Sequence, residues 1–194
     1  MTKMYPLLLE TIKIEEGKIH NLKYHQKRCD KSRLDLYHTP DTLSLISLIK
    51  PPKTGLYRCR ILYDTKLQTI EYIPYQEKEI KTLKLIESDL IYNYKYANRD
   101  ALNALLTLTA DMDDILIEQD GYIKDTTIAN IAFLDGTTWF TPSHPLLEGT
   151  MRAQLIDEGF LQTKEIRRED LSSYTQVALM NAMLGFKIID VTIE

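Results

Sequence analysis

The stretch IYNYKYANRDAL, residues 91–102, sets a single lysine among three tyrosines, directly ahead of a segment typical of a helix. Lysine becomes a nucleophile when desolvation or neighbouring charge lowers its pKa, because only the neutral amine attacks a carbonyl carbon. Tyr92, Tyr94 and Tyr96 could exclude water from Lys95 and supply hydroxyl groups. Taken alone, the stretch fits a solvated lysine beside a surface aromatic patch better, because lysines are commonly exposed. The role of Lys95 therefore depends on what lies on either side of it.

The chain ahead of this stretch has the pattern of an α+β lobe. Alternating residues on both sides of a Glu-Glu-Gly turn predict a β-hairpin within residues 5–22. We expect one helix that begins after Asn21, and a second that begins after Asp41 and ends before Pro51. Three strands complete the lobe, over residues 55–64, 67–75 and 82–87.

The chain after this stretch is richer in β-strands. A predicted helix over residues 98–112 comes first. Two Asp-Gly pairs, at residues 120–121 and 135–136, lie between alternating runs, which is the strongest short-range signal of a hairpin. We expect three or four antiparallel strands around these pairs, then a short helix after Gly149 and two further strands.

These patterns predict a two-lobed α+β protein. The first lobe would span residues 1–87 and the second, a C-terminal lobe rich in antiparallel strands, residues 96–194. Residues 88–95 would join them and end at Lys95. Because ligand sites usually lie in crevices between lobes, this places Lys95 where a site is expected.

Composition narrows the classes of function. The 194 residues carry a net charge of −4, whereas nucleic-acid binders usually have a basic excess, so we expect no nucleic-acid partner. Cys29 and Cys59 have the spacing of neither a metal site nor a disulfide framework, which predicts reduced thiols and no bound metal. The N-terminal apolar run is too short for a signal peptide or a membrane span. We therefore expect a cytoplasmic protein that does not contact membranes.

Three further groups could act together with Lys95. Arg28 could grip a phosphate through two parallel hydrogen bonds. Gly149 and Thr150 open a predicted helix, whose backbone N–H groups and dipole form an anion site. Asp125 lies on a predicted strand, and a carboxylate beside a pyridine nitrogen keeps that nitrogen protonated. Each group alone also fits an ordinary solvated residue or loop, but together they are the groups that pyridoxal 5′-phosphate requires.

With these groups in this order, the chain resembles the class IV (fold-type IV) pyridoxal-phosphate enzymes. That family includes branched-chain and D-amino-acid aminotransferases and 4-amino-4-deoxychorismate lyase. The similar segments are LLETIKIEEGKIHNLKYHQKR, YKYANRDAL, GYIKDTTIANIAF, TPSHPLLEGTMR and LMNAMLGF. The resemblance implies a D-amino-acid aminotransferase-like fold. The chain begins at the ETI strand, so we expect a trimmed N-terminal lobe.

The resemblance also implies a role for each site residue. Lys95 would be the Schiff-base lysine and the catalytic residue, Arg28 would bind the phosphate, and Asp125 would meet the pyridine nitrogen. The remaining cofactor-binding residues would be Gly149, Thr150 and Met151 in the phosphate loop, and Asn181 and Ala182 on a late strand.

Within the family, the KYANR segment is most similar to the aminodeoxychorismate lyases. Three positions depart from the usual pattern. Asp100 stands where branched-chain aminotransferases have a tyrosine that contacts the ring hydroxyl. Asp125 stands where glutamate is usual, and Ala182 where serine or threonine is usual, which removes one hydrogen bond to the phosphate.

Two arginines bear on the substrate. Arg58 and Arg60 project to the same face of a predicted strand, where their guanidinium groups could hold a carboxylate. A pair of outward-facing strand charges is an equal alternative. The resemblance implies a substrate-side arginine on this strand, and Arg60 is the better candidate.

Three functions remain open. The first is a lyase like 4-amino-4-deoxychorismate lyase, which acts on a small amino substrate with a carboxylate. It would release pyruvate and leave p-aminobenzoate for folate synthesis. The second is an amino-acid aminotransferase of the branched-chain or D-amino-acid type, and the third is a non-catalytic protein of the same fold. Members of the family are commonly homodimers, so the resemblance implies a homodimer.

Overall fold

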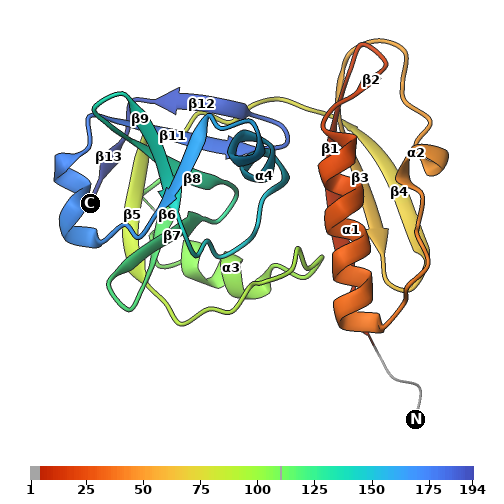
Figure 1. The fold of residues 1–194 in the computed structure, drawn as a ribbon, viewed down its shortest axis with the longest axis horizontal. Helices are drawn as coiled ribbons and strands as arrows, with labels where there is room; N and C mark the ends of the chain where they lie inside the picture. Colours follow the sequence, from red (N-terminus) through yellow and green to blue (C-terminus); the bar gives the residue numbers. More distant parts are fainter. Residues whose placement is uncertain (1–4, 110) are drawn as a thin grey trace. The chain divides into compact units, whose positions relative to one another are not determined.

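The computed structural model describes residues 5–109 and 111–194, and the chain forms two compact units (Figure 1). The first unit comprises the described residues up to Gln76 together with Tyr94–Asn98. The second comprises Glu77–Asn93 and Arg99–Glu194. We expected the lobes to divide near residue 87. The division at Gln76 differs from this, and the segment that holds Lys95 is part of the first unit.

An antiparallel sheet in the order β2-β1-β3-β4 forms one layer of the first unit. Its strands are β1 (Leu8–Glu15), β2 (Lys18–Ile19), β3 (Leu56–Tyr63) and β4 (Leu67–Pro74). The hairpin expected at the Glu-Glu-Gly turn is confirmed, because β1 and β2 pair across it. Glu16 and Gly17 have φ angles of 48° and 76°, which is the backbone of a tight hairpin turn.

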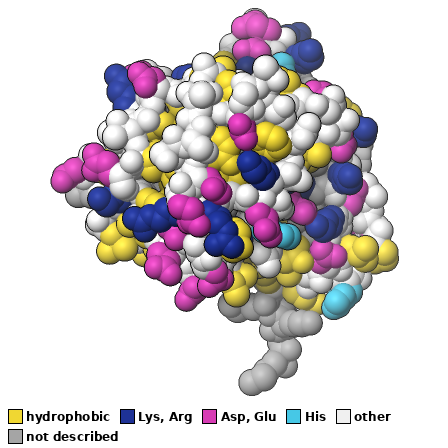
Figure 2. Space-filling model, turned by 60° about the vertical axis from the view of Figure 1, so that its left-hand side comes forward, with side chains coloured by type: hydrophobic (Ala, Val, Ile, Leu, Met, Phe, Trp, Pro, Cys, Tyr) yellow, Lys and Arg dark blue, Asp and Glu magenta, His cyan; other side chains and the backbone are white. Residues whose placement is uncertain are grey.

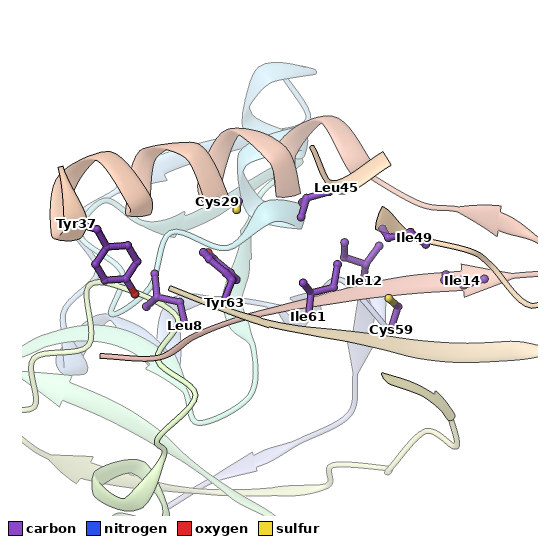
Figure 3. Close-up of a cluster of buried hydrophobic side chains, with 10 residues drawn as sticks. All are labelled: Leu8, Ile12, Ile14, Cys29, Tyr37, Leu45, Ile49, Cys59, Ile61 and Tyr63. Atoms are coloured by element: carbon purple, nitrogen blue, oxygen red, sulfur yellow. The ribbon is translucent and has the colours of Figure 1, made fainter. Parts of the chain in front are cut away.

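Helix α1 (Leu22–Tyr37) covers one face of this sheet and is the helix predicted after Asn21 (Figure 1). Alternate side chains of a strand share a face. Leu8, Ile12 and Ile14 of β1 are all fully buried and belong to one apolar cluster with Cys29 of α1 (Figure 3). Burial of each such side chain stabilises the unit by roughly 1.5–3 kcal/mol.

The second helix is shorter than expected. Helix α2 (Leu45–Leu48) is a single turn that begins after Ser44, so the prediction of a start at Asp41 is wrong. Asp41 has another partner, because its carbonyl and its carboxylate both accept hydrogen bonds from the Arg33 guanidinium. Asp41 therefore fastens the loop to α1 and does not cap a helix.

Two sheets make up the second unit, in the orders β13-β5-β6-β7 and β10-β9-β8-β11-β12. Their strands are β5 (Thr82–Glu87), β6 (Asp114–Gln119), β7 (Tyr122–Thr126), β8 (Asn130–Asp135), β9 (Thr138–Pro142), β10 (Leu161–Lys164), β11 (Gln176–Asn181), β12 (Gly185–Ile189) and β13 (Thr192–Ile193). The helical segments are α3 (Asp100–Leu106), α4 (Thr150–Asp157) and a 3₁₀ helix, Arg168–Ser173.

Apolar side chains of both sheets share one core. Leu83 and Leu116 come from the four-stranded sheet, and Ile131 and Phe133 come from the five-stranded one. Ala132, between the last two, faces the opposite side, where α4 packs. The second unit therefore has three layers: the four-stranded sheet, the five-stranded sheet and helix α4.

Both Asp-Gly hairpins are confirmed, since β6 pairs with β7 and β8 with β9 in antiparallel fashion. The prediction of an antiparallel lobe is wrong for three other pairs. β9 and β10 are parallel because α4 carries the chain back between them, and β5 and β6 are parallel across the longer connection that contains α3. β13 also joins β5 in parallel. β5, which we expected in the first lobe, thus lies in the second unit.

Charged side chains of both signs are mixed over the face shown in Figure 2, which agrees with the modest net charge of −4. Within residues 5–109 and 111–194, no helix has the length and apolar character needed to cross a membrane.

Replacement of Phe133 tests the core shared by the two sheets. Phe133 is fully buried, and its ring centroid lies 5.2 Å from that of Tyr174. We expect Phe133→Ala to lower the free energy of unfolding by about 3–5 kcal/mol, measured by urea denaturation. Ile188→Ala is the control, because Ile188 is 53% exposed and should cost less than about 1 kcal/mol. Equal losses in the two variants would contradict the assigned core.

Candidate functional site

Glu10 is a carboxylate inside the apolar core of the first unit. It lies on β1 between Leu8 and Ile12, on the same face, and is completely buried. Its Oε1 accepts a hydrogen bond from Arg28 Nε at 2.8 Å, and its Oε2 accepts one from Arg28 Nη2 at 2.6 Å. Oε2 also pairs with His25 Nδ1 at 2.6 Å. These three side chains, Glu10, His25 and Arg28, are called the Glu10 cluster below.

Burial and charge oppose each other in the Glu10 cluster. Burial alone would raise the pKa of Glu10, but the Arg28 guanidinium and the His25 ring outweigh it and hold this pKa at about 2. Burial lowers the pKa of His25, so the ring is neutral at pH 7 and donates its Nδ1 proton to Glu10. Burial would also lower the pKa of Arg28, but the Glu10 carboxylate outweighs it and raises that pKa.

Lys95 lies at the centre of a short turn that is attached to β1. The Tyr96 amide donates to the Tyr94 carbonyl at 2.9 Å and closes a three-residue turn around Lys95. The Leu9 amide donates to the Lys95 carbonyl at 2.9 Å and ties the turn to the strand. The backbone of Lys95 is therefore fixed on both sides.

Two of the tyrosines next to Lys95 are partly buried against the core of the first unit. Tyr94 and Tyr96 pack against the apolar side chains under α1, with their ring centroids 6.1 Å apart in an edge-to-face arrangement. The Tyr94 hydroxyl also lies 3.2 Å from an Asp35 carboxylate oxygen, to which it donates. Tyr92 is buried too, within the second unit. Tyr94 and Tyr96 therefore hold the turn in place.

Lys95 also acts on the Glu10 cluster through its charge. After burial, which is the main cause, the positive charges of Arg28 and Lys95 contribute to the lowered pKa of His25. Lys95 is therefore within electrostatic range of a ring that is hydrogen-bonded to Glu10. The structure brings the predicted amine and the predicted phosphate-binding arginine into one group of charges.

Arg58 and Arg60 lie on the face of β3 that points away from α1, since Cys59 and Ile61 between and beyond them fill the core. Arg58 is directly opposite Lys13 of β1. Arg60 Nη1 lies 3.2 Å from a carboxylate oxygen of Glu71, and both side chains are partly exposed. Lys13, Arg58 and Arg60 are called the basic face below, although Glu15 pairs with Lys13 and Glu71 with Arg60 on the same face.

Asp125 is a buried carboxylate of the second unit, on β7. Its Oδ1 accepts a hydrogen bond from Asn130 Nδ2 at 2.8 Å, and its Oδ2 accepts one from the Leu147 amide at 2.9 Å. Burial raises the pKa of Asp125 to about 6, although these hydrogen bonds and the charge of Arg152 oppose the rise. The carboxyl group is thus mostly ionised at pH 7, but a small further rise of its pKa would make much of it neutral.

The predicted phosphate loop leads into α4. Gly149 precedes the first helical residue and adopts an extended backbone, with φ −70° and ψ 147°. Thr150 is buried at the first position of the helix, and Met151 packs against the cluster of apolar side chains beneath α4. The short helix expected after Gly149 is confirmed.

Asn181 and Ala182 lie at the turn between β11 and β12. Asn181 Oδ1 accepts hydrogen bonds from the amides of Met183 and Leu184, at 2.9 and 2.8 Å. Its Nδ2 donates to the Ile128 carbonyl at 3.1 Å. The Asn181 side chain therefore stabilises this turn and connects it to the loop before β8.

The sequence profile of the family described as “Amino-transferase class IV” matches residues 63–190. The chain belongs to the class IV aminotransferase family. A relative from Haemophilus influenzae, named “Uncharacterized protein”, is 38% identical over 188 residues, which are 94% of this chain and 100% of that protein. A Schizosaccharomyces pombe protein named “Putative aminodeoxychorismate lyase” is 30% identical over 126 residues, which are 60% of this chain and 54% of that protein.

Solved structures of class IV proteins share this fold. The structure of a “putative 4-amino-4-deoxychorismate lyase” from Haemophilus somnus is 36% identical, with a TM-score of 0.82, over 95% of this chain and 100% of the other. A “Putative amino-acid aminotransferase” from Mesorhizobium loti is 20% identical, with a TM-score of 0.77, over 97% of this chain and 99% of the other. The expected fold-type IV architecture is confirmed.

Sequence reasoning missed several residues that surround the site residues of this class IV chain. An acid at position 10 interrupts the apolar face of an alternating strand, which was a usable sign that Glu10 has a buried partner. His25 and Arg28 are three residues apart on one helix, so they can meet the same partner. Asn130 and Arg152 gave no comparable signal. Among the described residues, no group of His, Cys, Asp and Glu side chains is arranged to hold a metal ion.

Replacement of Glu10 tests the buried cluster. We expect Glu10→Gln to lower the free energy of unfolding by about 3–5 kcal/mol at pH 7, because it leaves the Arg28 charge buried without its carboxylate. Glu71→Gln is the matched control, since the Arg60–Glu71 pair is partly exposed and should contribute less than about 1 kcal/mol. Urea denaturation of the three proteins measures the difference. Equal stability of the wild type and Glu10→Gln would contradict the cluster.

The contribution of Glu10 to stability should also depend on pH. Because folding lowers the pKa of Glu10 from 4.5 to about 2, its contribution is complete above pH 4.5 and is lost as the pH falls toward 2. The shift corresponds to roughly 3 kcal/mol. We expect the stability of the wild type to approach that of Glu10→Gln over this interval, as measured by denaturation between pH 6 and 2.

Proposed function

We propose that this class IV protein binds pyridoxal 5′-phosphate and acts as a 4-amino-4-deoxychorismate lyase. The observation that carries the proposal is the fixed turn at Lys95, within electrostatic range of the Glu10 cluster. An amine and a phosphate-binding guanidinium are the two groups that this cofactor requires from the first unit.

The side chains fit the chemistry of this cofactor. A guanidinium binds phosphate through parallel N–H donors, and the two hydrogen bonds to Glu10 fix the orientation of the Arg28 group. Asp125 is buried and mostly ionised at pH 7, as a partner of a protonated pyridine nitrogen must be. When bound, pyridoxal phosphate would supply an electron-accepting ring that stabilises negative charge on the substrate Cα.

Each residue then has a defined task. Lys95 Nζ would hold the cofactor covalently and, once the substrate amine has taken its place, remove the proton from the substrate Cα as a general base. Asp125 would accept the hydrogen bond of the pyridine N–H group and keep this nitrogen protonated. Arg28 would bind the phosphate in the orientation that Glu10 gives it. By the family resemblance, Gly149, Thr150, Met151, Asn181 and Ala182 would complete the phosphate side.

The arginines of the first unit match the charge of the substrate that the lyase reaction requires. 4-Amino-4-deoxychorismate carries two carboxylates, since its products pyruvate and p-aminobenzoate each have one. The basic face supplies two guanidinium groups from a single strand, with Arg60 as our candidate for the contact. The KYANR segment and the names of the S. pombe and H. somnus relatives favour the same reaction. The product p-aminobenzoate would serve folate synthesis.

An amino-acid aminotransferase is the second candidate. The tasks given to Lys95 and Asp125 serve both reactions, and the M. loti relative is named for that activity. In this case Lys95 would carry the proton from the substrate Cα to the cofactor. Water would release a keto acid, and the amino group kept by the cofactor would pass to a second keto acid. For either reaction we propose a homodimer in the cytoplasm.

The first experiment is an absorbance spectrum of the purified protein with pyridoxal phosphate, before and after borohydride. We expect a visible band in the wild type, which borohydride converts to a covalent label on Lys95, located by mass spectrometry of peptides. Lys95→Ala should carry no label, and Lys66→Ala, an exposed lysine of the same unit, should be labelled like the wild type. A wild type that stays colourless and unlabelled would refute cofactor binding. The hypothesis of a non-catalytic protein of the same fold would then remain.

Product analysis then separates the two reactions. The lyase predicts equal amounts of pyruvate and p-aminobenzoate from 4-amino-4-deoxychorismate. The aminotransferase predicts repeated turnover of an amino acid to a keto acid only when a second keto acid is added, and at most one equivalent per active site without it.

Replacement of Arg60 tests the substrate contact. We expect Arg60→Ala to raise KM for 4-amino-4-deoxychorismate roughly tenfold or more, with little change in kcat, because a carboxylate contact held equally in the ground and transition states is lost. Lys66→Ala serves as the control for a lost positive charge on the same unit. An unchanged KM in Arg60→Ala would remove the basic face from the substrate site.

A further inference from the structure

Asn130 is the centre of a closed set of hydrogen bonds in the second unit. Its Nδ2 has two hydrogens and donates one to Asp125 Oδ1 and one to the Leu147 carbonyl, both at 2.8 Å. The Leu147 amide returns a hydrogen bond to Asp125 Oδ2 at 2.9 Å. Asn130, Asp125 and the Leu147 backbone thus fix one another. Asn130 is itself buried, so water does not compete for these bonds.

Gly149 is the residue that leaves room for the Asn130 amide. A Cβ atom at position 149 would lie 1.9 Å from Asn130 Oδ1 and 3.1 Å from its Cγ, far inside contact distance. The backbone of Gly149, at φ −70° and ψ 147°, is one that any residue can adopt. Space for Asn130, and not backbone conformation, is therefore what requires glycine here.

We propose that Asn130 is a positioning residue for the Asp125 carboxylate, and that position 149 is glycine in order to admit the Asn130 side chain. This inference rests on the proposed role of Asp125 toward the pyridine nitrogen. It gives Gly149 a different task from the phosphate contact that the family resemblance implies. A backbone N–H group can bind a phosphate from any residue, whereas only glycine accommodates the amide.

The chemical consequence concerns the charge of Asp125. A hydrogen bond donated to a carboxylate favours its ionised form, so loss of Asn130 Nδ2 raises the pKa of Asp125 above its present value of about 6. The other groups that favour ionisation are the Leu146 and Leu147 amides and the charge of Arg152 on α4. Without Asn130, a larger fraction of Asp125 would be neutral at pH 7 and would no longer hold a proton on the pyridine nitrogen.

The first test compares two ligands. One is pyridoxal phosphate, and the other is its analogue with carbon in place of the pyridine nitrogen. Asn130→Ala should weaken pyridoxal phosphate roughly tenfold, because a hydrogen bond to a charged group is lost, and should weaken the analogue less than twofold. Absorbance titration at pH 7 gives both dissociation constants. Asn103→Ala, in exposed α3 of the same unit, is the control. Equal weakening of both ligands would show a merely structural role and overturn the assignment.

The second test needs no cofactor. Where Asn130 is present, Gly149→Ala should strongly lower the thermal unfolding midpoint of the apo-protein, because the added methyl group meets Asn130 Oδ1. In the Asn130→Ala background the same change should have little effect, because the amide is gone. A similar drop in both backgrounds would overturn the explanation of Gly149. Asn130→Ser, with a hydroxyl too short to replace the amide, takes the place of Asn130→Ala if that variant does not fold.

The two tests separate this inference from the proposed function. If the wild type binds no pyridoxal phosphate, the proposed function fails, and the role of Asn130 toward the pyridine nitrogen falls with it. The double-mutant cycle of Gly149→Ala and Asn130→Ala still tests whether glycine is needed at position 149 to make room for the Asn130 side chain. If the wild type binds the cofactor and Asn130→Ala binds it equally well, the positioning role fails while the proposed function stands.

Discussion

The Glu10 carboxylate is completely buried, and side chains of the first unit satisfy its oxygen atoms. A carboxylate that is buried without a partner is unfavourable by several kcal/mol. Two nitrogens of Arg28 and one of His25 meet it, all from α1. The pairing therefore sets the distance and the rotation of the helix against β1. Apolar packing of Leu8, Ile12 and Cys29 would hold the helix to the sheet, but it would tolerate small shifts that these directional contacts do not.

Asp125 is a buried carboxylate with the opposite electrostatic balance to Glu10. Glu10 has a full positive charge in contact and a pKa of about 2, whereas Asp125 has mainly neutral donors and a pKa of about 6. Glu10 is thus ionised well below neutral pH, whereas the ionisation of Asp125 near neutral pH depends on its neighbours. Groups whose environments move their pKa values apart commonly take different roles at a site. The difference here comes from the contacts, because both carboxylates are buried.

Local signals in the sequence predicted the elements, while tertiary contacts decided their partners. The Asp-Gly pairs and the Glu-Glu-Gly turn specify hairpins within a few residues, so those strands were found correctly. β5 has no hairpin partner, and its place beside β6 depends on a distant strand. The start of α2 was missed because Arg33, eight positions earlier, takes the oxygen atoms of Asp41.

The sequence predicted some residues of the candidate site and missed the residues that support them. Arg28, Lys95 and Asp125 were proposed as site residues because their residue types and order carry chemistry. Glu10 and Asn130, which orient two of them, were not found, because supporting residues are recognised only by what they touch. The tyrosines around Lys95 were interpreted as groups that exclude water from its amine, and the structure shows that Tyr94 and Tyr96 also pack against the core of the first unit.

The turn at Lys95 has a mechanical consequence. Its carbonyl is held by Leu9, and the residues on both sides are joined to each other by a hydrogen bond. The Cα of the lysine is therefore a fixed pivot, and every position that its amine reaches is set by rotation of four side-chain bonds. The conformational entropy of this backbone is already lost when the unit folds. Such a tethered amine meets any group within its arc at a far higher effective concentration than a free amine in solution would.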